Sequence, residues 1–307
     1  MRKDSDFYCL IQKICKDKGI LMKDASFGYI TELEKNGQVK RIVGDSLELN
    51  TATSFKIASD KFACYSVLVQ HEIPSIQYHM IFNPETRVGY EENDMQKAAI
   101  LFQQYHEKVI LKANTSSKGK DVFCITNWEK LKRKIVDQFA NHKDSVSICP
   151  FYDIGYEYRA IFLDGEIIFC FKKEKPYVIG DGKKSLKELV GDFETENLYE
   201  DLNLNDIPKE NEKVEISWKH NLCLGGVPDL EIDDETRQRV YDLALKAGKA
   251  IGIRFASVDI AETKEKELLV MEINSNVCMN KFAETVSNGL QIEYEIFSNA
   301  IDRMFEA

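Results

Sequence analysis

The chain has 307 residues, of which 44% are hydrophobic and 30% charged, with only 16 Gly and 6 Pro. This composition is globular, and it excludes disordered, collagen-like and low-complexity chains, while the length suits an enzyme of two lobes. No apolar run approaches the roughly 20 residues that cross a bilayer, and the N-terminus lacks the features of a secretory leader. With 41 basic against 51 acidic residues and no basic stripe, we expect neither a membrane nor a nucleic-acid partner.

Eight cysteines are scattered along the chain without any CxxC pair. In a chain of this size such spacing favours reduced, buried thiols over a disulfide framework. We therefore expect a cytoplasmic protein.

The first elements expected are a helix around residues 7–18 and a hairpin over 29–44, which turns at Asn36-Gly37, a preferred two-residue turn. Start signals at Ser59-Asp60 predict a helix to residue 70, and a second helix follows over 94–105. Two β-branched runs within 108–125 predict a hairpin with a wide polar turn, followed by a helix over 128–141. Residues 145–173 contain a strand and then a hairpin that turns at Asp164-Gly165.

The second half begins with residues 191–215, which carry nine acids against two lysines and are expected to form a solvated excursion without chemistry. A helix then follows Asp233-Asp234, with one apolar face made of Val240, Leu243, Ala244, Ala247 and Ile251. Two apolar strands, ASVDIA and ELLVMEIN, come after it. Hairpins mixed with helices predict the α+β class rather than a doubly wound parallel sheet.

Polar residues interrupt these last two strands at informative positions. Glu272 and Asn274 lie two apart and so share one face of a strand, and Asp259 comes opposite if the two strands pair. Carboxylate and amide oxygens are the ligands that Mg²⁺ takes, together with phosphate oxygens. The alternative is two ordinary strands with polar residues facing solvent.

Two lysines form the second feature. Lys61 opens a helix and Lys112 lies within the apolar strand VILKAN, where an ammonium must reach solvent or meet an anion. The loop that follows, Ser116 to Lys120, suits a flap over phosphates, although a solvated turn has the same composition. It is not a Walker A loop.

In its order of segments the chain resembles the ATP-grasp superfamily, and more closely the ATP-grasp part of cyanophycin synthetase and of bifunctional glutathione synthetase. The matching stretches run from Ala58 to Met279, in the order IASDKFACYSVLVQHEIP, KVILKANTSSKGKDV, GYEYRAIFLDGEI, PYVIGDGKKSLKELV, KHNLCLGG, SVDIA and VMEINSN. The resemblance implies an ATP-grasp fold in which two α+β lobes clasp a nucleotide. We expect a short N-terminal segment over residues 1–58, a central lobe over 59–148 and a C-terminal lobe with the metal site over 149–307.

The resemblance also implies roles for individual residues. Those expected to hold ATP are Lys61 and Lys112 at the phosphates, Ser116, Ser117, Lys118 and Gly119 in the covering loop, Pro150, Phe151 and Tyr152 at the adenine hinge, and Glu157 at the ribose. This chain has Pro and Phe where relatives usually carry a hinge glutamate, so backbone groups have to supply the adenine contact. The expected catalytic residues are Arg159 near the transferred phosphate, Lys219 where many relatives have Arg, and Asn221. Asp259, Glu272 and Asn274 match the metal ligands.

These features predict an ATP- and Mg²⁺-dependent carboxylate–amine ligase, with Mn²⁺ as an alternative metal, that forms an amide bond through an acyl phosphate. The expected partners are small-molecule or peptide carboxylates and amines. A phosphotransferase acting on a hydroxyl is the alternative enzyme, and a non-catalytic ATP- or peptide-binding module is a second rival. The sequence leaves open the two substrates, whether the product is a polymer, whether the chain is a homodimer, and whether a partner completes the short N-terminal region.

Overall fold

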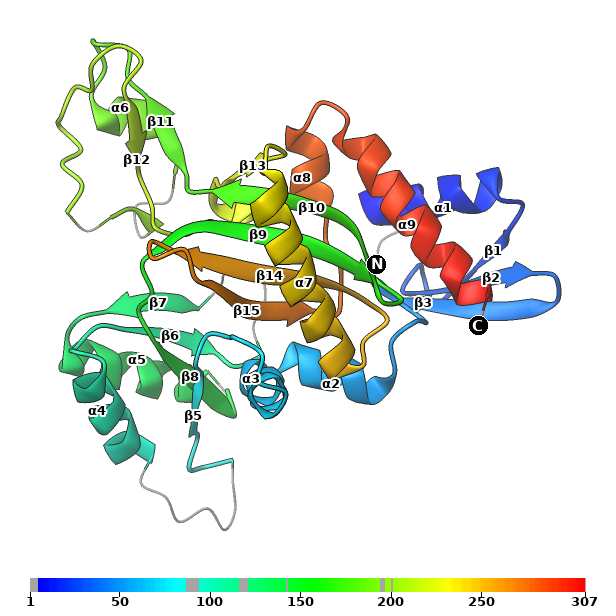
Figure 1. The fold of residues 1–307 in the computed structure, drawn as a ribbon, viewed down its shortest axis with the longest axis horizontal. Coiled ribbons are helices and arrows are strands. Elements are labelled where there is room, and N and C mark those ends of the chain that lie inside the picture. Colours follow the sequence, from blue (N-terminus) through cyan, green and yellow to red (C-terminus); the bar gives the residue numbers. More distant parts are fainter. Residues whose placement is uncertain are drawn as a thin grey trace.

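The computed structural model describes residues 5–86, 94–115, 121–141, 143–193, 197–199 and 201–306. Helices and antiparallel sheets alternate along the chain, so the predicted α+β class is confirmed (Figure 1). Within the described ranges, no helix is both long and apolar enough to cross a membrane. The helices are α1 (Asp6–Asp17), α2 (Ala52–Ser59), α3 (Lys61–Gln70), α4 (Asp94–Gln104), α5 (Trp128–Ala140), α6 (Leu186–Val190), α7 (Asp234–Ile251), α8 (Asn280–Thr285) and α9 (Gly289–Phe305).

A five-stranded antiparallel sheet forms the centre of the molecule. Its hairpin turns at Asp164 and Gly165, as predicted, with φ values of 47° and 89° that suit a tight two-residue turn. The strands in spatial order are β13 (Val227–Asp229), β10 (Glu166–Glu174), β9 (Ile154–Leu163), β14 (Phe255–Thr263) and β15 (Leu268–Asn274).

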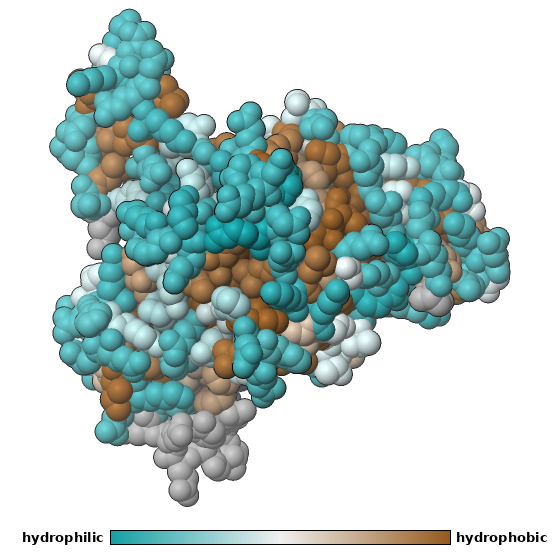
Figure 2. Space-filling model, in the orientation of Figure 1, coloured by the Kyte–Doolittle hydropathy of each residue, from teal (hydrophilic) through white to brown (hydrophobic). Residues whose placement is uncertain are grey.

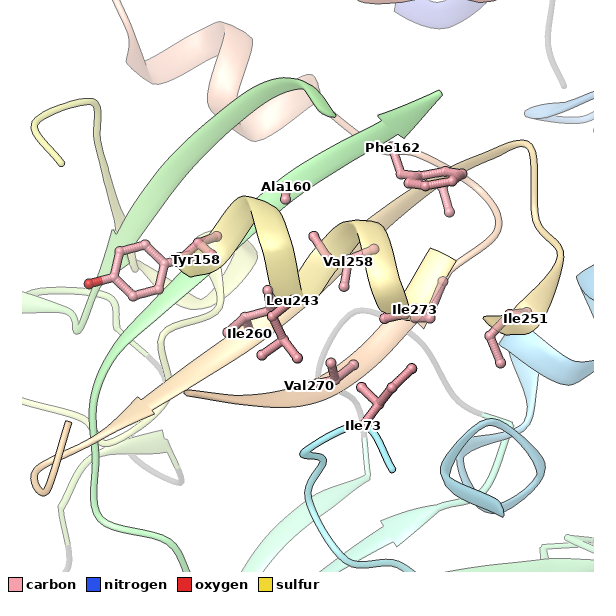
Figure 3. Packing of buried hydrophobic residues seen from close by; sticks show 14 of the residues in the cluster. Ile73, Tyr158, Ala160, Phe162, Leu243, Ile251, Val258, Ile260, Val270 and Ile273 are labelled. Carbon is pink, nitrogen blue, oxygen red and sulfur yellow. The ribbon is translucent and has the colours of Figure 1, made fainter. Parts of the chain in front are cut away.

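Helix α7 covers one face of this sheet. All five residues of its predicted apolar face are buried, and they pack on alternate residues of β9, β14 and β15, such as Ala160, Val258 and Ile273 (Figure 3). Gly248 lies against the ring of Phe162, so close that a Cβ there would come within 2.6 Å of the ring. The opposite face of the sheet is therefore the one left for polar side chains.

A second antiparallel sheet lies beside the first and consists, in order, of β5 (His79–Phe82), β8 (Ser145–Pro150), β6 (Val109–Ala113) and β7 (Val122–Ile125). Helices α4 and α5 cover its outer face and bury Val109 and Leu111 of β6. The intervening residue Ile110 joins a smaller cluster that includes Ala261 of the central sheet. The two sheets thus approach each other along this second face.

The N-terminal residues form a sheet of their own, made of β1 (Leu21–Ala25), β2 (Ile30–Lys35), β3 (Gln38–Val43) and β4 (Ser46–Leu47). Asn36 and Gly37, with φ values of 51° and 79°, make the predicted turn between β2 and β3. Helices α1 and α9 share a core with this sheet and with the far ends of β9 and β10. The N-terminal segment is therefore packed onto the C-terminal helix.

The described parts of residues 177–215 project from one end of the central sheet as a small unit with β11 (Tyr177–Ile179), β12 (Lys213–Glu215) and α6 (Figure 1). Apolar surface is visible on this projection (Figure 2), where Ile179 and Ile207 are 48% and 58% exposed. The solvated excursion predicted over 191–215 is confirmed for most of its described residues, but not for all of them. Asn197 and Leu198 are buried, and β12 pairs with β11, because apolar residues between the acids fold back onto the preceding strand.

Helix α3 begins at Lys61 after the cap Asp60, whose carboxylate accepts a hydrogen bond from the Ala63 amide at 2.8 Å, in agreement with the predicted start. Helix α2, directly before it, was not predicted. Its sequence ATSFKIAS has little periodicity, and only Ser54 and Ala58 are buried along it.

Candidate active site

A cleft of about 840 Å³ lies between the five-stranded central sheet and the sheet of β5, β8, β6 and β7. Every predicted site residue within the described part of the chain lines it, and the predicted loop Ser116, Ser117, Lys118 and Gly119, with Lys120, lies outside the described residues. The lining residues among the predictions are Lys61, Lys112, Pro150, Phe151, Tyr152, Glu157, Arg159, Lys219, Asn221, Asp259, Glu272 and Asn274.

The strand register brings the charged residues of the central sheet together. Asp259 on β14 is paired with Arg159 on β9 at one side and with Glu272 on β15 at the other. A β-bulge follows directly, since Ile260 pairs with Val270 and leaves Met271 as an extra residue in β15. The predicted pairing of the two strands is thereby confirmed.

Asp259 and Arg159 form a buried bidentate ion pair, with both nitrogen–oxygen distances at 2.8 Å. Burial alone would raise the pKa of Asp259, but Arg159 and Lys173 outweigh it and hold that pKa well below its ordinary value. Arg159 also reaches the carbonyl of Cys278 at 3.4 Å. The arginine is therefore fixed in place at the floor of the cleft.

The side chain of Asn274 lies between the two candidate metal-binding carboxylates. Its amide nitrogen is 3.4 Å from Asp259 Oδ2 and 3.3 Å from Glu272 Oε1. Among the described residues no three His, Cys, Asp or Glu gather as a metal site, so the candidate set is two carboxylates and one amide. That set fits Mg²⁺, which takes few protein oxygens and completes its shell with phosphate and water.

Lys61 and Lys112 face this sheet from the other wall of the cleft, and both are buried. Asn114, which follows β6, holds the start of α3 in place: its carbonyl accepts a hydrogen bond from the Lys61 amide at 3.3 Å, and its side chain accepts one from the Phe62 amide at 3.2 Å. Burial lowers the pKa of Lys61, Glu272 opposes this, and Lys112 lowers it further. Two ammonium groups in one buried wall make a site for an anion.

Lys112 has few compensating partners. Its ammonium lies 3.3 Å from the Tyr78 hydroxyl and 5.5 Å from that ring's centroid, and no carboxylate of the described residues is within 4 Å. Burial raises the pKa of Tyr78, and it raises the pKa of Cys149 to about 11, so both groups are neutral near pH 7. The positive charge of Lys112 is thus available to a ligand.

Glu157 is held by two residues that sequence reasoning did not place in the site. Lys173 Nζ is 2.8 Å from Glu157 Oε2, and His220 Nδ1 is 3.7 Å from Oε1. Burial would raise the pKa of Glu157, but Lys173 and His220 lower it below its usual value. Lys173 lies in a run of charges, KKEK, that suggests a solvated strand end. The pairing of Lys173 on β10 with Glu157 on β9 would have placed it in the site, but this register is not visible in the sequence.

The predicted Lys219 and Asn221 lie at the end of the cleft beneath the projection. Lys219 donates to the side chain of Asn197 at 2.9 Å, and Asn221 accepts from the Cys223 amide at 2.8 Å to begin a 3₁₀ turn over Leu222–Leu224. A Cβ at Gly226 would approach the His220 carbonyl oxygen to 2.5 Å, so this position requires glycine. The loop is therefore a tightly closed wall.

The predicted hinge begins at Pro150, the last residue of β8, and continues through Phe151 and Tyr152. The Phe151 amide donates to the Lys108 carbonyl at 3.4 Å, the Lys108 ammonium lies 3.7 Å from the centroid of the Phe151 ring, and Trp218 meets that ring edge-on at 6.5 Å. Pro150 has no amide proton to offer. This end of the cleft is thus lined by aromatic rings, with one ammonium group packed against Phe151.

Comparison with known proteins places this geometry in context. Residues 210–299 match the family model of the RimK-like ATP-grasp domain. The chain is 24% identical over 202 residues to the glutathione biosynthesis bifunctional protein of Clostridium perfringens, covering 55% of this chain and 26% of that protein. It is 21% identical over 295 residues to the cyanophycin synthetase of Trichormus variabilis, and this match covers 86% of this chain and 31% of that protein.

A solved bifunctional glutathione synthetase from Pasteurella multocida superposes with a TM-score of 0.57 at 17% identity, over 95% of this chain and 43% of that one. This likeness establishes the fold. The chain spans only about a quarter to a third of the length of the two curated relatives described above.

Proposed function

We propose that this chain is an ATP- and divalent-metal-dependent carboxylate–amine ligase that releases ADP, in keeping with its match to the RimK-like ATP-grasp domain over residues 210–299 and its likeness in fold to a bifunctional glutathione synthetase. One observation carries the proposal: two buried lysines on one wall of a cleft face two carboxylates, an amide and an arginine on the other. Phosphoryl transfer needs little beyond positioning and neutralisation of charge, and this set supplies both.

In the first step a substrate carboxylate oxygen attacks the γ-phosphorus of ATP. The bond from that phosphorus to the β–γ bridging oxygen breaks, and ADP leaves with the electron pair. We assign Lys61 and Lys112 to the phosphates of the nucleotide and Arg159 to the transferred phosphoryl group. Arginine suits that place because its rigid fork lines the cleft and is anchored through Nε and Nη2 by Asp259, while Nη1 lies 3.4 Å from the Cys278 carbonyl oxygen.

In the second step the nitrogen of an amine attacks the carbonyl carbon of the acyl phosphate. The bond from that carbon to the phosphate oxygen breaks, inorganic phosphate leaves, and the amine loses a proton to solvent. No nucleophilic side chain is needed, so Cys223 and Cys278, both exposed at the cleft, have no covalent role in this scheme. Lys219 and Asn221 are assigned to the acyl end.

The metal would be held by Asp259, Glu272 and Asn274, and when bound it neutralises charge on the β- and γ-phosphates. The nucleotide would lie between the lobes of residues 59–148 and 149–307, with adenine at Pro150–Tyr152 and ribose at Glu157. Phe7 and Asp45 also line the cleft, so the segment over residues 1–58 would form part of the substrate wall. We propose amino acids or peptides as substrates, in the cytoplasm.

The test is ADP release across a panel of amino acids and dipeptides, supplied alone and in pairs, with hydroxylamine as a trap. A hydroxamate that appears only with ATP and one particular acid supports the ligase. A stable phosphoester product would instead identify a phosphotransferase. Nucleotide binding without ADP release for any pair in the panel would identify a non-catalytic ATP-binding module, and absence of nucleotide binding would likewise overturn the proposal.

A further inference from the structure

Lys173 is a buried lysine that contacts two carboxylates of the cleft at once. Its ammonium is 2.8 Å from Glu157 Oε2 and 3.5 Å from Asp259 Oδ1, and its side chain is only 4% exposed. Glu157 and Asp259 are the residues assigned above to the ribose and to the metal. The lysine thus joins the two ends of the proposed nucleotide site.

The geometry of the sheet explains why a long cationic side chain is required there. Lys173 lies on β10, directly opposite Glu157 on β9, whereas Asp259 lies one strand further, on β14. Two strand spacings amount to about 10 Å, so the side chain has to run across the face of β9 to meet the second carboxylate. Arginine could make the same span, but a shorter or neutral residue could not replace both contacts.

The neighbouring Lys172 shows what an ordinary paired lysine does on the same strand. It points to the opposite face, where its ammonium forms an ion pair with Asp229 at 2.7 Å and lies 4.9 Å from the Tyr156 ring centroid. It does not line the cleft. Lys172 is therefore a matched control for the loss of one paired lysine from β10.

We propose that Lys173 is a positioning residue that orients Glu157 toward the ribose of the nucleotide and, through Asp259, weakens the affinity of the metal site. The inference rests on the proposed function, since it requires a nucleotide in this cleft. Glu157 has both oxygens engaged, one by Lys173 and the other facing His220, so its carboxylate plane is set by these two neighbours.

The proposal predicts two effects of opposite sign when the charge is removed. Without Lys173, Glu157 loses its short contact and no longer presents a fixed acceptor to the ribose hydroxyls. At the same time the metal site becomes one unit more negative, so a divalent cation should bind there more tightly. General loosening of the fold would weaken both ribose recognition and metal binding. Weaker ribose recognition together with tighter metal binding is therefore expected only if Lys173 has the proposed role.

The experiment compares the wild type with Lys173→Met, using ADP and 2′-deoxy-ADP in titration calorimetry. The wild type is expected to prefer ADP by about 10-fold or more, as a charge-assisted hydrogen bond gives, and Lys173→Met to prefer it by less than about 3-fold. Mn²⁺ binding, followed by electron paramagnetic resonance at saturating ADP, is expected to tighten about 3- to 10-fold. Lys172→Met should leave both measurements unchanged.

A double variant guards against a Lys173→Met protein that does not fold. Lys173→Met with Glu157→Gln removes both charges of the pair and should show the same ribose discrimination as Glu157→Gln alone, because the lysine acts through that carboxylate. A further loss in the double variant would refute the inference, as would full discrimination or weakened Mn²⁺ binding in Lys173→Met. A wild type that binds no ADP would overturn the proposed function itself, which is a separate result.

Discussion

Replacing Lys112 with methionine should stabilise the nucleotide-free protein while weakening nucleotide binding. Burial of an ammonium costs several kcal/mol, and the hydroxyl and ring of Tyr78 return about 1–3 kcal/mol of it. Lys112 is 9% exposed and has no carboxylate within 4 Å among the described residues, so part of the cost is not offset. We expect Lys112→Met to raise the unfolding free energy of the nucleotide-free protein by about 1–2 kcal/mol, which corresponds to a rise in Tm of about 2–4 °C.

Methionine fills nearly the same volume as the lysine stem, so packing in β6 should be retained. The Tyr78 hydroxyl keeps a partner, because it donates to the Met271 carbonyl at 3.0 Å. The substitution therefore leaves the Tyr78 hydroxyl with a hydrogen-bond partner, and no unsatisfied polar group should reduce the gain in stability.

The nucleotide should lose a charge-assisted contact with a phosphate. Truncating one partner of a buried charge pair costs about 2–4 kcal/mol, which corresponds to a Kd about 30- to 1,000-fold weaker. Thermal unfolding with and without Mg·ADP measures both effects in one assay. A Lys112→Met protein that is less stable than the wild type without nucleotide, or that gains as much stability from Mg·ADP, would refute this reasoning.

Three further predictions concern the metal site and the core. Glu272→Gln should reduce ADP release at least about 100-fold because it removes one carboxylate charge from the metal set, with an unchanged circular dichroism spectrum, and undiminished turnover would count against the assignment. Burial, with Asp6 and Glu284 nearby, raises the pKa of Glu293 from 4.5 to about 7. The folded state therefore binds more protons than the unfolded state between these values, and unfolding free energy falls as pH rises through them. Allowing for solvent access, the unfolding free energy of Glu293→Gln relative to the wild type should be about 1–2 kcal/mol higher at pH 8 than at pH 4.5 in urea titrations. The same difference between the two proteins at both pH values would contradict this. Gly248→Ala should destabilise by about 1–2 kcal/mol in the same assay, because overpacking against Phe162 exceeds the helix-propensity gain; a more stable variant would show that the ring can move aside.

Much of the fold was predictable where periodicity is strong. The apolar face of α7 and the turns at Asn36-Gly37 and Asp164-Gly165 were expected from residue spacing and lie where predicted. Helix α2 was missed because only two of its residues are buried, and the strand pairing within the projection was missed because it joins β11 to β12 across more than thirty residues.

The site was predictable where two residues share a strand or face each other across one turn. Glu272 and Asn274 follow the two-residue period, and Asp259 needed only the pairing of neighbouring strands. Lys173 depends on a register across two strands, which no local pattern in KKEK reveals. The contact of Lys219 with Asn197 likewise joins a loop residue to an acidic segment expected to be solvated. The roles of all these residues in catalysis stay predictions.

The extra residue in β15 has a consequence for how such a cleft can be remodelled. A strand normally sends alternate side chains to opposite faces, yet here Met271 and Glu272 both line the cleft, since the bulge absorbs one step of the alternation. The carboxylate half of the strand is thereby uncoupled from the apolar half. Residues before Met271 in β15 can be exchanged to suit a different base or acyl group without turning Glu272 and Asn274 away from their partner on β14.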